Sequence, residues 1–159
     1  MKFVVISVGK IKESYLKAGI KDFMDRLRPY TSIELVEGLE EKTPPNPTEA
    51  QINTVLDKEG RKILAQVREG DYFIALDSRG RSMTSETFAE TIETLLPQGY
   101  SRIIFAIGGS HGFSPEVISR ANLKLSLSQL TFPHQMAVLI FLEQLYRSFK
   151  IMKGEPYHK

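Results

Sequence analysis

Short apolar runs alternate along the chain with longer segments in which apolar residues recur at helical spacing. The runs have the length and continuous hydrophobicity of buried strands, and they lie at Phe3–Val8, Ile33–Val36, Tyr72–Leu76, Ile103–Ile107 and Leu123–Leu127. Strands that alternate with helices in this way predict a mainly parallel sheet with helices on both faces, joined by right-handed crossovers. The predicted fold class is therefore α/β.

Capping residues mark where several of the helices should begin. Thr48 can cap a helix that reaches about Arg68, and Thr84 or Ser85 can cap the next one. The tripeptide Ser114-Pro115-Glu116 combines a cap, a proline at the first helical position and an acid at the positive end of the helix dipole. It predicts a short helix before the last strand.

The first helix and two loops follow from the same pattern. The helix should run from about Glu13 to Arg28, with Pro29 marking its end. Its predicted buried residues are Tyr15, Leu16, Ile20, Phe23 and Leu27. The proline-rich, acidic segment Gly38–Thr48 and the glycine-containing segment Asp77–Ser82 predict loops, the first of them mobile.

The final helix, from about Gln135 to Met152, carries more apolar residues than one helix face can hold. They are Met136, Val138, Leu139, Ile140, Phe141, Leu142, Leu145, Tyr146, Phe149, Ile151 and Met152. Both sides of this helix should therefore be buried, either within its own domain or against a second copy of the chain. A symmetric homodimer is the economical arrangement.

Composition narrows the class of protein. With 159 residues, of which 42% are hydrophobic, the chain can bury one sizeable core, so residues 1–159 should form a single domain. It has no cysteine and three histidines, which excludes a zinc–thiolate site and argues against a bound metal. The first apolar run is too short for a signal peptide, and no apolar stretch is long enough to span a membrane. We expect a cytoplasmic protein with no membrane segment.

Two of the predicted strands end in loops suited to holding a small molecule. Ile103–Ile107 leads into Gly108-Gly109-Ser110-His111-Gly112, in which the glycines let a ligand approach the backbone closely. Leu123–Leu127 leads into Ser128–His134. In an open parallel sheet both loops lie beyond the carboxyl ends of the strands, where ligands bind. A phosphate cradle is disfavoured, because the glycine loop has no lysine and matches no nucleotide-binding motif.

Several short motifs together give the chain a family resemblance that covers nearly its whole length. They are Val8-Gly9-Lys10, Leu76-Asp77, Ile107-Gly108-Gly109 with Gly112-Phe113-Ser114, Leu125–His134, Leu145-Tyr146-Arg147 and Pro156-Tyr157-His158. With these motifs the chain resembles the bacterial 23S rRNA pseudouridine-N3 methyltransferases of the SPOUT class, in the branch without an added RNA-binding domain. The resemblance implies a C-terminal trefoil knot and a homodimer whose interface includes the last helix.

The same resemblance implies S-adenosyl-L-methionine as the methyl donor, without a metal. Carried over residue by residue, the donor site would comprise Leu76, Gly108, Gly109, Leu127, Ser128, Gln129, Leu130, Thr131 and Phe132. Leucine and phenylalanine side chains can form an apolar slot for adenine, and loop amides can orient its ring edge. Without the resemblance, core packing would explain the leucines and tight turns would explain the glycines.

The C-terminal segment carries the residues expected to act on the target base. The resemblance implies that Tyr157-His158-Lys159 completes the active site, with a ring that stacks on the base, an imidazole and a cation. Glu143 and Arg147 are further catalytic candidates, although a plain helical ion pair explains their spacing equally well. The expected RNA contacts are Lys150, Lys153 and Lys159. Taken alone, this segment reads as a frayed terminus with a basic helix end.

The leading expectation is therefore methylation of N3 of a pseudouridine in 23S rRNA on the assembled 70S ribosome. An alternative from another class is a ribosome-binding assembly factor that retains the ligand pocket without catalysis. The intact His158 argues against this alternative. A flavodoxin-like nucleotide-binding module would need phosphate-binding loops. Ser110 and His111 form a poor hydrolase pair, because neighbours in one loop seldom face each other and no acid orients the imidazole.

Overall fold

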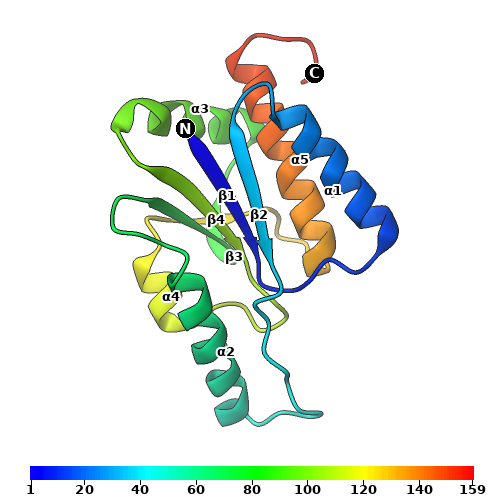
Figure 1. Cartoon of the computed structure of the whole chain (residues 1–159), viewed down its shortest axis with the longest axis vertical. Coiled ribbons are helices and arrows are strands. Elements are labelled where there is room, and N and C mark those ends of the chain that lie inside the picture. The colour runs from blue at the N-terminus through cyan, green and yellow to red at the C-terminus, as the bar shows by residue number, and fades with distance from the viewer.

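A five-stranded parallel sheet forms the centre of the molecule, and the computed structural model describes all 159 residues (Figure 1). The strands are β1 (Lys2–Ser7), β2 (Ser32–Glu37), β3 (Tyr72–Ser82), β4 (Arg102–Ile107) and β5 (Leu123–Ser126). Their spatial order is β2-β1-β4-β3-β5, and every neighbouring pair is parallel. The predicted α/β class is confirmed, whereas the trefoil knot stays a prediction.

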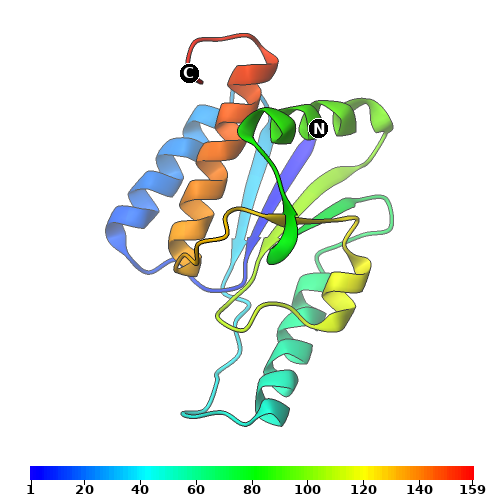
Figure 2. The ribbon, with the colours of Figure 1, turned by 180° about the vertical axis from the view of Figure 1, so that it is seen from behind.

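Helices cover both faces of the sheet (Figures 1 and 2). One face carries α1 (Ser14–Leu27), α3 (Ser85–Leu95) and α5 (His134–Met152), and the other carries α2 (Glu49–Leu64) and α4 (Pro115–Arg120). A short 3-10 turn, Leu96–Gln98, follows α3. The predicted caps are in place: the hydroxyls of Thr48, Thr84 and Ser114 accept the backbone N–H groups of the residues three positions on.

The alternation of side chains along the strands divides the core into two layers. On β1, Phe3 and Val5 pack with residues of α1, α3 and α5, whereas Val4 and Ile6 pack on the side of α2 and α4. All four side chains are at most 2% exposed, so β1 is covered on both faces. This double burial explains why Phe3–Ile6 is hydrophobic at every position rather than at every second one.

Helix α5 lies between α1 and α3, with one side on the sheet (Figure 2). Its most deeply buried residues include Phe141, Leu142 and Leu145, each 0% exposed, and no residue of the helix belongs to the exposed class. The protein's own sheet and helices bury one side of α5, whereas the other side, with Met136, Leu139, Ile140, Ile151 and Met152, is only partly buried. The homodimer stays a prediction.

The loop predicted at Asp77–Ser82 is wrong, because β3 continues through it. After a register shift beyond Leu76, the strand pairs with β5 again at Arg81 and Ser82. Gly80 explains this second pairing, since a Cβ at that position would come within 2.6 Å of the Lys124 carbonyl carbon. Glycine lets the two strand backbones approach where any side chain would keep them apart.

Two details of the predicted helices are also wrong. Helix α2 ends at Leu64 rather than near Arg68, because the following residues form tight turns and the Arg68 backbone N–H donates to an Asp71 carboxylate oxygen at 2.8 Å. Tyr15 is 65% exposed instead of buried, while its neighbour Leu16 is 4% exposed and occupies the side of α1 that faces the core. The extended segment between β2 and α2 is found as predicted, from Gly38 to Thr48.

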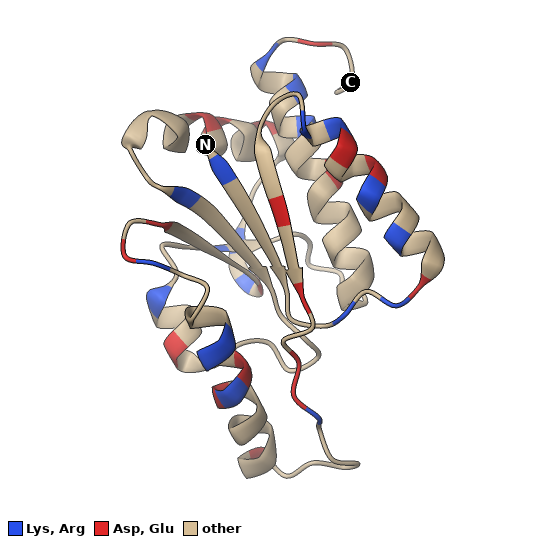
Figure 3. Cartoon of the chain, in the orientation of Figure 1, with Lys and Arg blue, Asp and Glu red and all other residues tan.

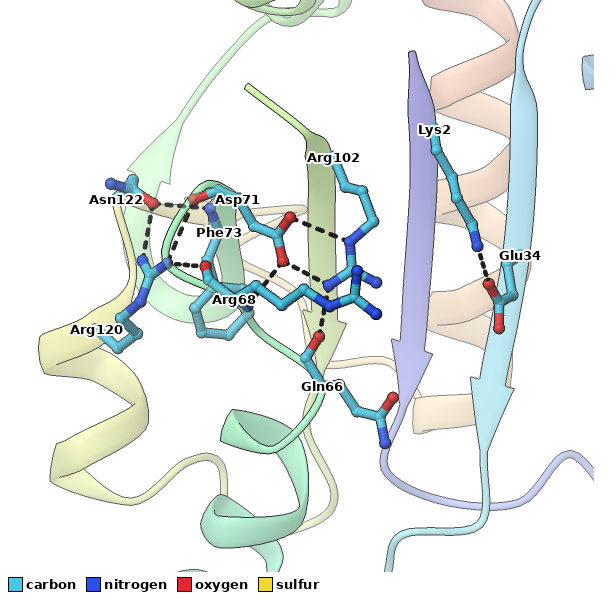
Figure 4. Close-up of polar contacts among 9 residues, drawn as sticks. All are labelled: Lys2, Glu34, Gln66, Arg68, Asp71, Phe73, Arg102, Arg120 and Asn122. Atoms are coloured by element: carbon cyan, nitrogen blue, oxygen red, sulfur yellow. Dashed lines mark hydrogen bonds and ion pairs between the residues drawn. The ribbon is translucent and has the colours of Figure 1, made fainter. Parts of the chain in front are cut away.

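A buried polar network ties together the amino ends of β3 and β4 (Figure 4). The Arg102 guanidinium donates to both carboxylate oxygens of Asp71, at 3.1 and 2.5 Å, and to the Gln66 carbonyl at 2.9 Å. Arg120 donates to the carbonyls of Arg68 and Asp71, at 3.0 and 3.3 Å. This network holds the connections that enter β3 at the end of the sheet remote from the glycine loop.

Candidate active site

A pocket of about 760 Å³ lies beyond the carboxyl ends of β4 and β5 and beside the register shift of β3, at Leu76–Ser78. Because the strands are parallel, these ends meet at one edge of the sheet, as the sequence predicts. The pocket is lined by Leu76, Asp77, Ser78, Ile107, Gly108, Gly109, Ser110, Gly112, Phe113, Leu127, Ser128, Leu130, Thr131, Phe132, Pro133, His134 and Ala137. Eight of the nine predicted donor-site residues are in this set, and Gln129 is not.

The glycine loop after β4 depends on the absence of side chains at two points. A Cβ at Gly108 would lie 3.1 Å from the Gly112 carbonyl oxygen and 3.2 Å from the Phe113 ring, so the loop leaves little room there. Gly112 has a φ of +80°, which other residues rarely adopt. Around Gly109 nothing lies within 4 Å of such a Cβ, so its backbone is open to a ligand.

The loop after β5 is held by short hydrogen bonds of its serines. Ser126 Oγ donates to the Ser128 carbonyl at 3.1 Å, and Ser128 Oγ accepts the Leu130 backbone N–H at 2.9 Å. These bonds fold the loop back on itself and leave the Leu130 side chain 74% exposed at the pocket. Exposure of a large apolar side chain beside a cavity is typical of a surface that a ligand covers.

The structure also brings together the predicted catalytic residues of the tail, at the other end of α5. Arg147 donates to Glu143 Oε1 at 2.5 Å and contacts His158 Nδ1 at 3.1 Å, and the Tyr157 hydroxyl donates to Glu143 Oε1 at 3.0 Å. The Arg147 guanidinium lies 4.8 Å from the centre of the Tyr157 ring. Burial, reinforced by the bond to Glu143, raises the pKa of the Tyr157 hydroxyl.

One member of this cluster, Glu86, was not predicted from the sequence. Its Oε1 lies 2.6 Å from His158 Nε2. Since Arg147 can only donate, His158 Nδ1 must accept, and Nε2 then carries the proton that is donated to Glu86. The bond from His158 lowers the pKa of the Glu86 carboxyl. Glu86 is 72 positions from His158, so no local pattern could have paired them.

Lys and Arg positions are spread along the chain and include the C-terminal part of α5 (Figure 3). The predicted RNA-contacting lysines differ in their ion pairing. Lys150 Nζ is paired with Glu155 at 2.6 Å and lies 5.5 Å from the Tyr146 ring, and the bond to Glu155 raises its pKa. Lys153 and Lys159 are exposed and form no ion pair within the chain. Of the three predicted RNA contacts, Lys153 and Lys159 therefore present a free positive charge.

Within one chain the tail cluster does not line the pocket. The pocket contacts the start of α5 at His134, whereas Arg147 lies near its end (Figure 1). These residues are 13 positions apart, so at about 1.5 Å per residue roughly 20 Å of helix separate them. The structure thus places the predicted site residues in two groups, one at the start of α5 and one that extends from Glu143, in the middle of α5, to the C-terminal tail.

Two pocket residues outside the predicted donor set could have been found from their place beside the predicted loops. Phe113 follows the glycine loop, and His134 follows Phe132 and Pro133. His134 Nε2 is fully buried without a hydrogen-bond partner, and a Cβ at Gly9 would overlap its ring. His134 therefore orders the loop by packing, as its sequence context indicates.

The pocket lies at the strand ends of a parallel α/β sheet, which is where sheets of this kind bind small molecules. Residues 1–158 match the family described as "Predicted SPOUT methyltransferase", and the chain belongs to this SPOUT methyltransferase family. The resemblance seen in the sequence is confirmed. No group of three or more His, Cys, Asp or Glu side chains is placed to hold a metal ion. None of the helices has both the length and the apolar character needed to cross a membrane.

Curated relatives match the chain over its whole length. A protein from Halothermothrix orenii is 52% identical and one from Streptococcus thermophilus is 51% identical, each over 100% of both chains, and both are named ribosomal RNA large subunit methyltransferase H. A solved structure of a probable methylase family protein from Haemophilus influenzae covers 99% of this chain and aligns with 70% of its own, with a TM-score of 0.51 and 14% identity. That similarity shows a shared fold.

Proposed function

We propose that the protein transfers a methyl group from S-adenosyl-L-methionine to N3 of a pseudouridine in 23S rRNA, on the assembled 70S ribosome. The observation that carries this proposal is the pocket at the carboxyl edge of the sheet. Three separate segments, around Leu76, Gly108 and Leu127–Phe132, meet there in a member of a methyltransferase family. The name of the 52% identical relative, which specifies ribosomal RNA of the large subunit, supports the substrate class.

The residues present fit the donor. Leu76, Leu127 and Phe132 give the pocket apolar walls, and the open backbone of Gly109 offers polar groups without a side chain in the way. When bound, S-adenosyl-L-methionine supplies an electrophilic methyl group on a positively charged sulfur. The face of the Phe132 ring can attract that charge. These residues would bind and orient the donor and exclude water from it.

The acceptor side of the reaction needs groups that this pocket alone does not supply. The imide proton at N3 must leave, and the nitrogen must lie within about 3–3.5 Å of the methyl group. In the same chain, Arg147 of the tail cluster lies roughly 20 Å along α5 from His134 of the pocket. We therefore propose a homodimer in which the tail of one copy, with Tyr157 and His158, reaches the pocket of the other. The ring would stack on the base, and Arg147 and Glu143 would hold His158 in place.

Recognition of RNA would fall to the free cations near the tail. Lys153 and Lys159 are exposed and unpaired, so they can neutralise phosphates. Lys150 is engaged by Glu155 and would contribute less. A protein of 159 residues has little surface for reading sequence, so the shape of the ribosomal site would provide the specificity. A protein acting on assembled ribosomes works in the cytoplasm.

The test is incubation with methyl-labelled S-adenosyl-L-methionine and 70S ribosomes that lack the modification, followed by nuclease digestion and mass spectrometry of the rRNA. Label on N3 of one pseudouridine is the expected result. Donor binding without label, on ribosomes shown to contain the pseudouridine, would favour the non-catalytic assembly factor. Failure to bind the donor would overturn the methyltransferase proposal.

A further inference from the structure

A second cleft, of about 240 Å³, adjoins the donor pocket. It contains Gly9 and Lys10 of the Val8-Gly9-Lys10 motif, to which the proposed function assigns no role. It is also lined by Glu41, before α2, and by Glu59 on α2. The cleft and the donor pocket share Gly109, Ser110 and His134. A molecule held in the cleft would therefore face one held in the pocket.

Glu59 is the unusual residue of this cleft. It is 8% exposed, and none of the ion pairs of the protein includes it. Its Oε2 accepts the Glu41 backbone N–H at 3.0 Å, while Oε1 has no partner within the protein and is not among the fully buried polar atoms. Oε1 is thus a free acceptor, not fully buried, on a residue that lines the cleft.

The electrostatic surroundings make this carboxylate a better base than an exposed one. Burial, more than any other cause, raises the pKa of Glu59, and the charges of Glu40 and Glu41 add to the increase. The bond from the Glu41 backbone and the charge of Lys62 act in the opposite direction. Lys62 Nζ is itself paired with Glu41 at 2.7 Å, so it does not neutralise Glu59. A carboxyl pKa closer to neutrality suits proton transfer at physiological pH.

Other ionisable groups at the cleft are less suited to take a proton. His134 Nε2 is sealed against Gly9, and His111 is exposed at the mouth. Lys10 and Lys12 are exposed cations without an ion-pair partner, and as cations they would stabilise negative charge that develops on a carbonyl oxygen of a bound ring. The lining of the cleft therefore combines a free acceptor with two unpaired cations.

We propose that this second cleft holds the imide edge of the target base and that Glu59 is the catalytic base of the transfer. This inference rests on the proposed function. The N3 proton moves to Glu59 Oε1, and the nitrogen electron pair forms a bond to the donor methyl carbon. The carbon–sulfur bond breaks at the same time, and its electrons leave with neutral S-adenosylhomocysteine. The Tyr157 ring of the tail would then position the base rather than accept its proton.

The pH dependence of this step can be stated from the groups that face Glu59. They are Glu40, Glu41, Lys62, Lys10, Lys12, His111 and His134. Only the deprotonated carboxylate can accept the N3 proton, so the rate should rise with pH as Glu59 ionises. The raised pKa moves this rise above the value near 4.3 that is usual for glutamate.

The test compares Glu59→Gln with wild-type protein in single-turnover methylation of 70S ribosomes across pH. Glutamine still offers an oxygen to the Glu41 backbone N–H, so the fold should persist. We expect unchanged donor affinity by calorimetry, a rate lower by about 100-fold or more, and loss of the acidic limb of the pH–rate profile. Glu59→Asp should keep the acidic limb of the pH–rate profile but methylate more slowly than wild type. Asp57→Asn, an exposed acid on α2 outside both cavities, is the control and should match wild type.

The outcomes separate this inference from the proposed function. If the wild-type protein labels rRNA and Glu59→Gln keeps the wild-type rate or the acidic limb of the pH–rate profile, the role of Glu59 is overturned and the proposed function stands. A wild-type protein that binds the donor but labels no rRNA would overturn both. If thermal unfolding shows that Glu59→Gln is not folded, the pH profile of Glu59→Asp decides, because a merely structural carboxylate would not control the limb.

Discussion

The two ends of α5 carry candidate active-site groups of different construction. At its start, the donor pocket is made of loop backbone and apolar side chains, with Gly108 and Gly109 at its centre. At its end, the tail cluster is made of charged and polar side chains, with Arg147 bound to both Glu143 and His158. The first is shaped to hold a ligand, and the second is shaped to hold a histidine and a tyrosine in place. Under the proposed function, a methyl transfer needs both groups.

The largest expected effect comes from filling the glycine loop. Gly108→Arg places a long side chain where a Cβ already lies 3.1 Å from the Gly112 carbonyl oxygen, so it should block the donor site. We expect donor affinity to fall at least about 100-fold, or roughly 3 kcal/mol, by calorimetry. Ala65→Arg, which adds the same side chain at an exposed position after α2, should bind normally. Undiminished binding by a folded Gly108→Arg protein would refute the assignment of this pocket.

Mixing two inactive variants tests whether the tail acts across a dimer. His158→Ala should lower the methylation rate by about 100-fold or more. Donor affinity should not change, because the donor pocket lies at the start of α5, away from His158. When this variant is refolded together with Gly108→Arg, half of the dimers pair one intact pocket with the intact tail of the partner. Activity should return to about a quarter of wild type if the tail acts in trans. No recovery in confirmed mixed dimers would mean that the tail acts on its own chain.

How much the sequence predicts also differs between the two ends. The pocket was predictable because its parts are local: apolar runs end in glycine or polar loops, and parallel strands bring such ends to one edge. The Glu143–Arg147 pair was predictable from helical spacing. The contact of Glu86 with His158 was not predictable, since only the packing of α3 against α5 brings the two residues together.

The errors in the predicted secondary structure also arise from contacts between residues that are not close in the sequence pattern. Gly80 looks like a turn residue in the sequence, yet it lets β3 continue against β5, which is visible only once the two strands are paired. Likewise the early end of α2 depends on Asp71, whose carboxylate captures the Arg68 backbone N–H. Side chains that act on distant backbone do not appear in the periodicity from which the elements were predicted.

The Asp71–Arg102 pair offers a change that should affect stability without touching either end of α5. The Asp71 side chain is 0% exposed and that of Arg102 is 14% exposed, so Asp71→Ala leaves a buried cation without its partner. We expect a loss of about 3–5 kcal/mol in the free energy of unfolding by denaturant titration. Removing the exposed pair through Glu34→Ala should cost less than about 1 kcal/mol. If Asp71→Ala loses less than about 1 kcal/mol, the network contributes little to the free energy of unfolding.

The same carboxylate gives a pH dependence of stability. Burial alone would raise the pKa of Asp71, but the bonds from Arg102 and from the Arg68 backbone more than offset this and hold the pKa below its ordinary value. A carboxyl whose pKa is lower in the folded state stabilises the fold above its unfolded pKa, near 3.9, and this contribution is lost as pH falls through the folded pKa. The acid-induced loss of stability should therefore be smaller in Asp71→Ala than in wild type. Equal pH dependence in the two proteins would contradict the lowered pKa.

The smallest effect is expected from the free lysines near the tail. Lys153 is exposed and has no ion-pair partner, so it should contact RNA phosphate without touching donor or base. Lys153→Gln should weaken ribosome binding a few-fold and lower the slope of log affinity against log salt by about 1, with donor affinity and Tm unchanged. Lys58→Gln, an exposed lysine on α2, serves as the control for loss of one positive charge. An equal change in salt slope for both variants would mean that net charge, rather than a contact at the tail, governs binding to the ribosome.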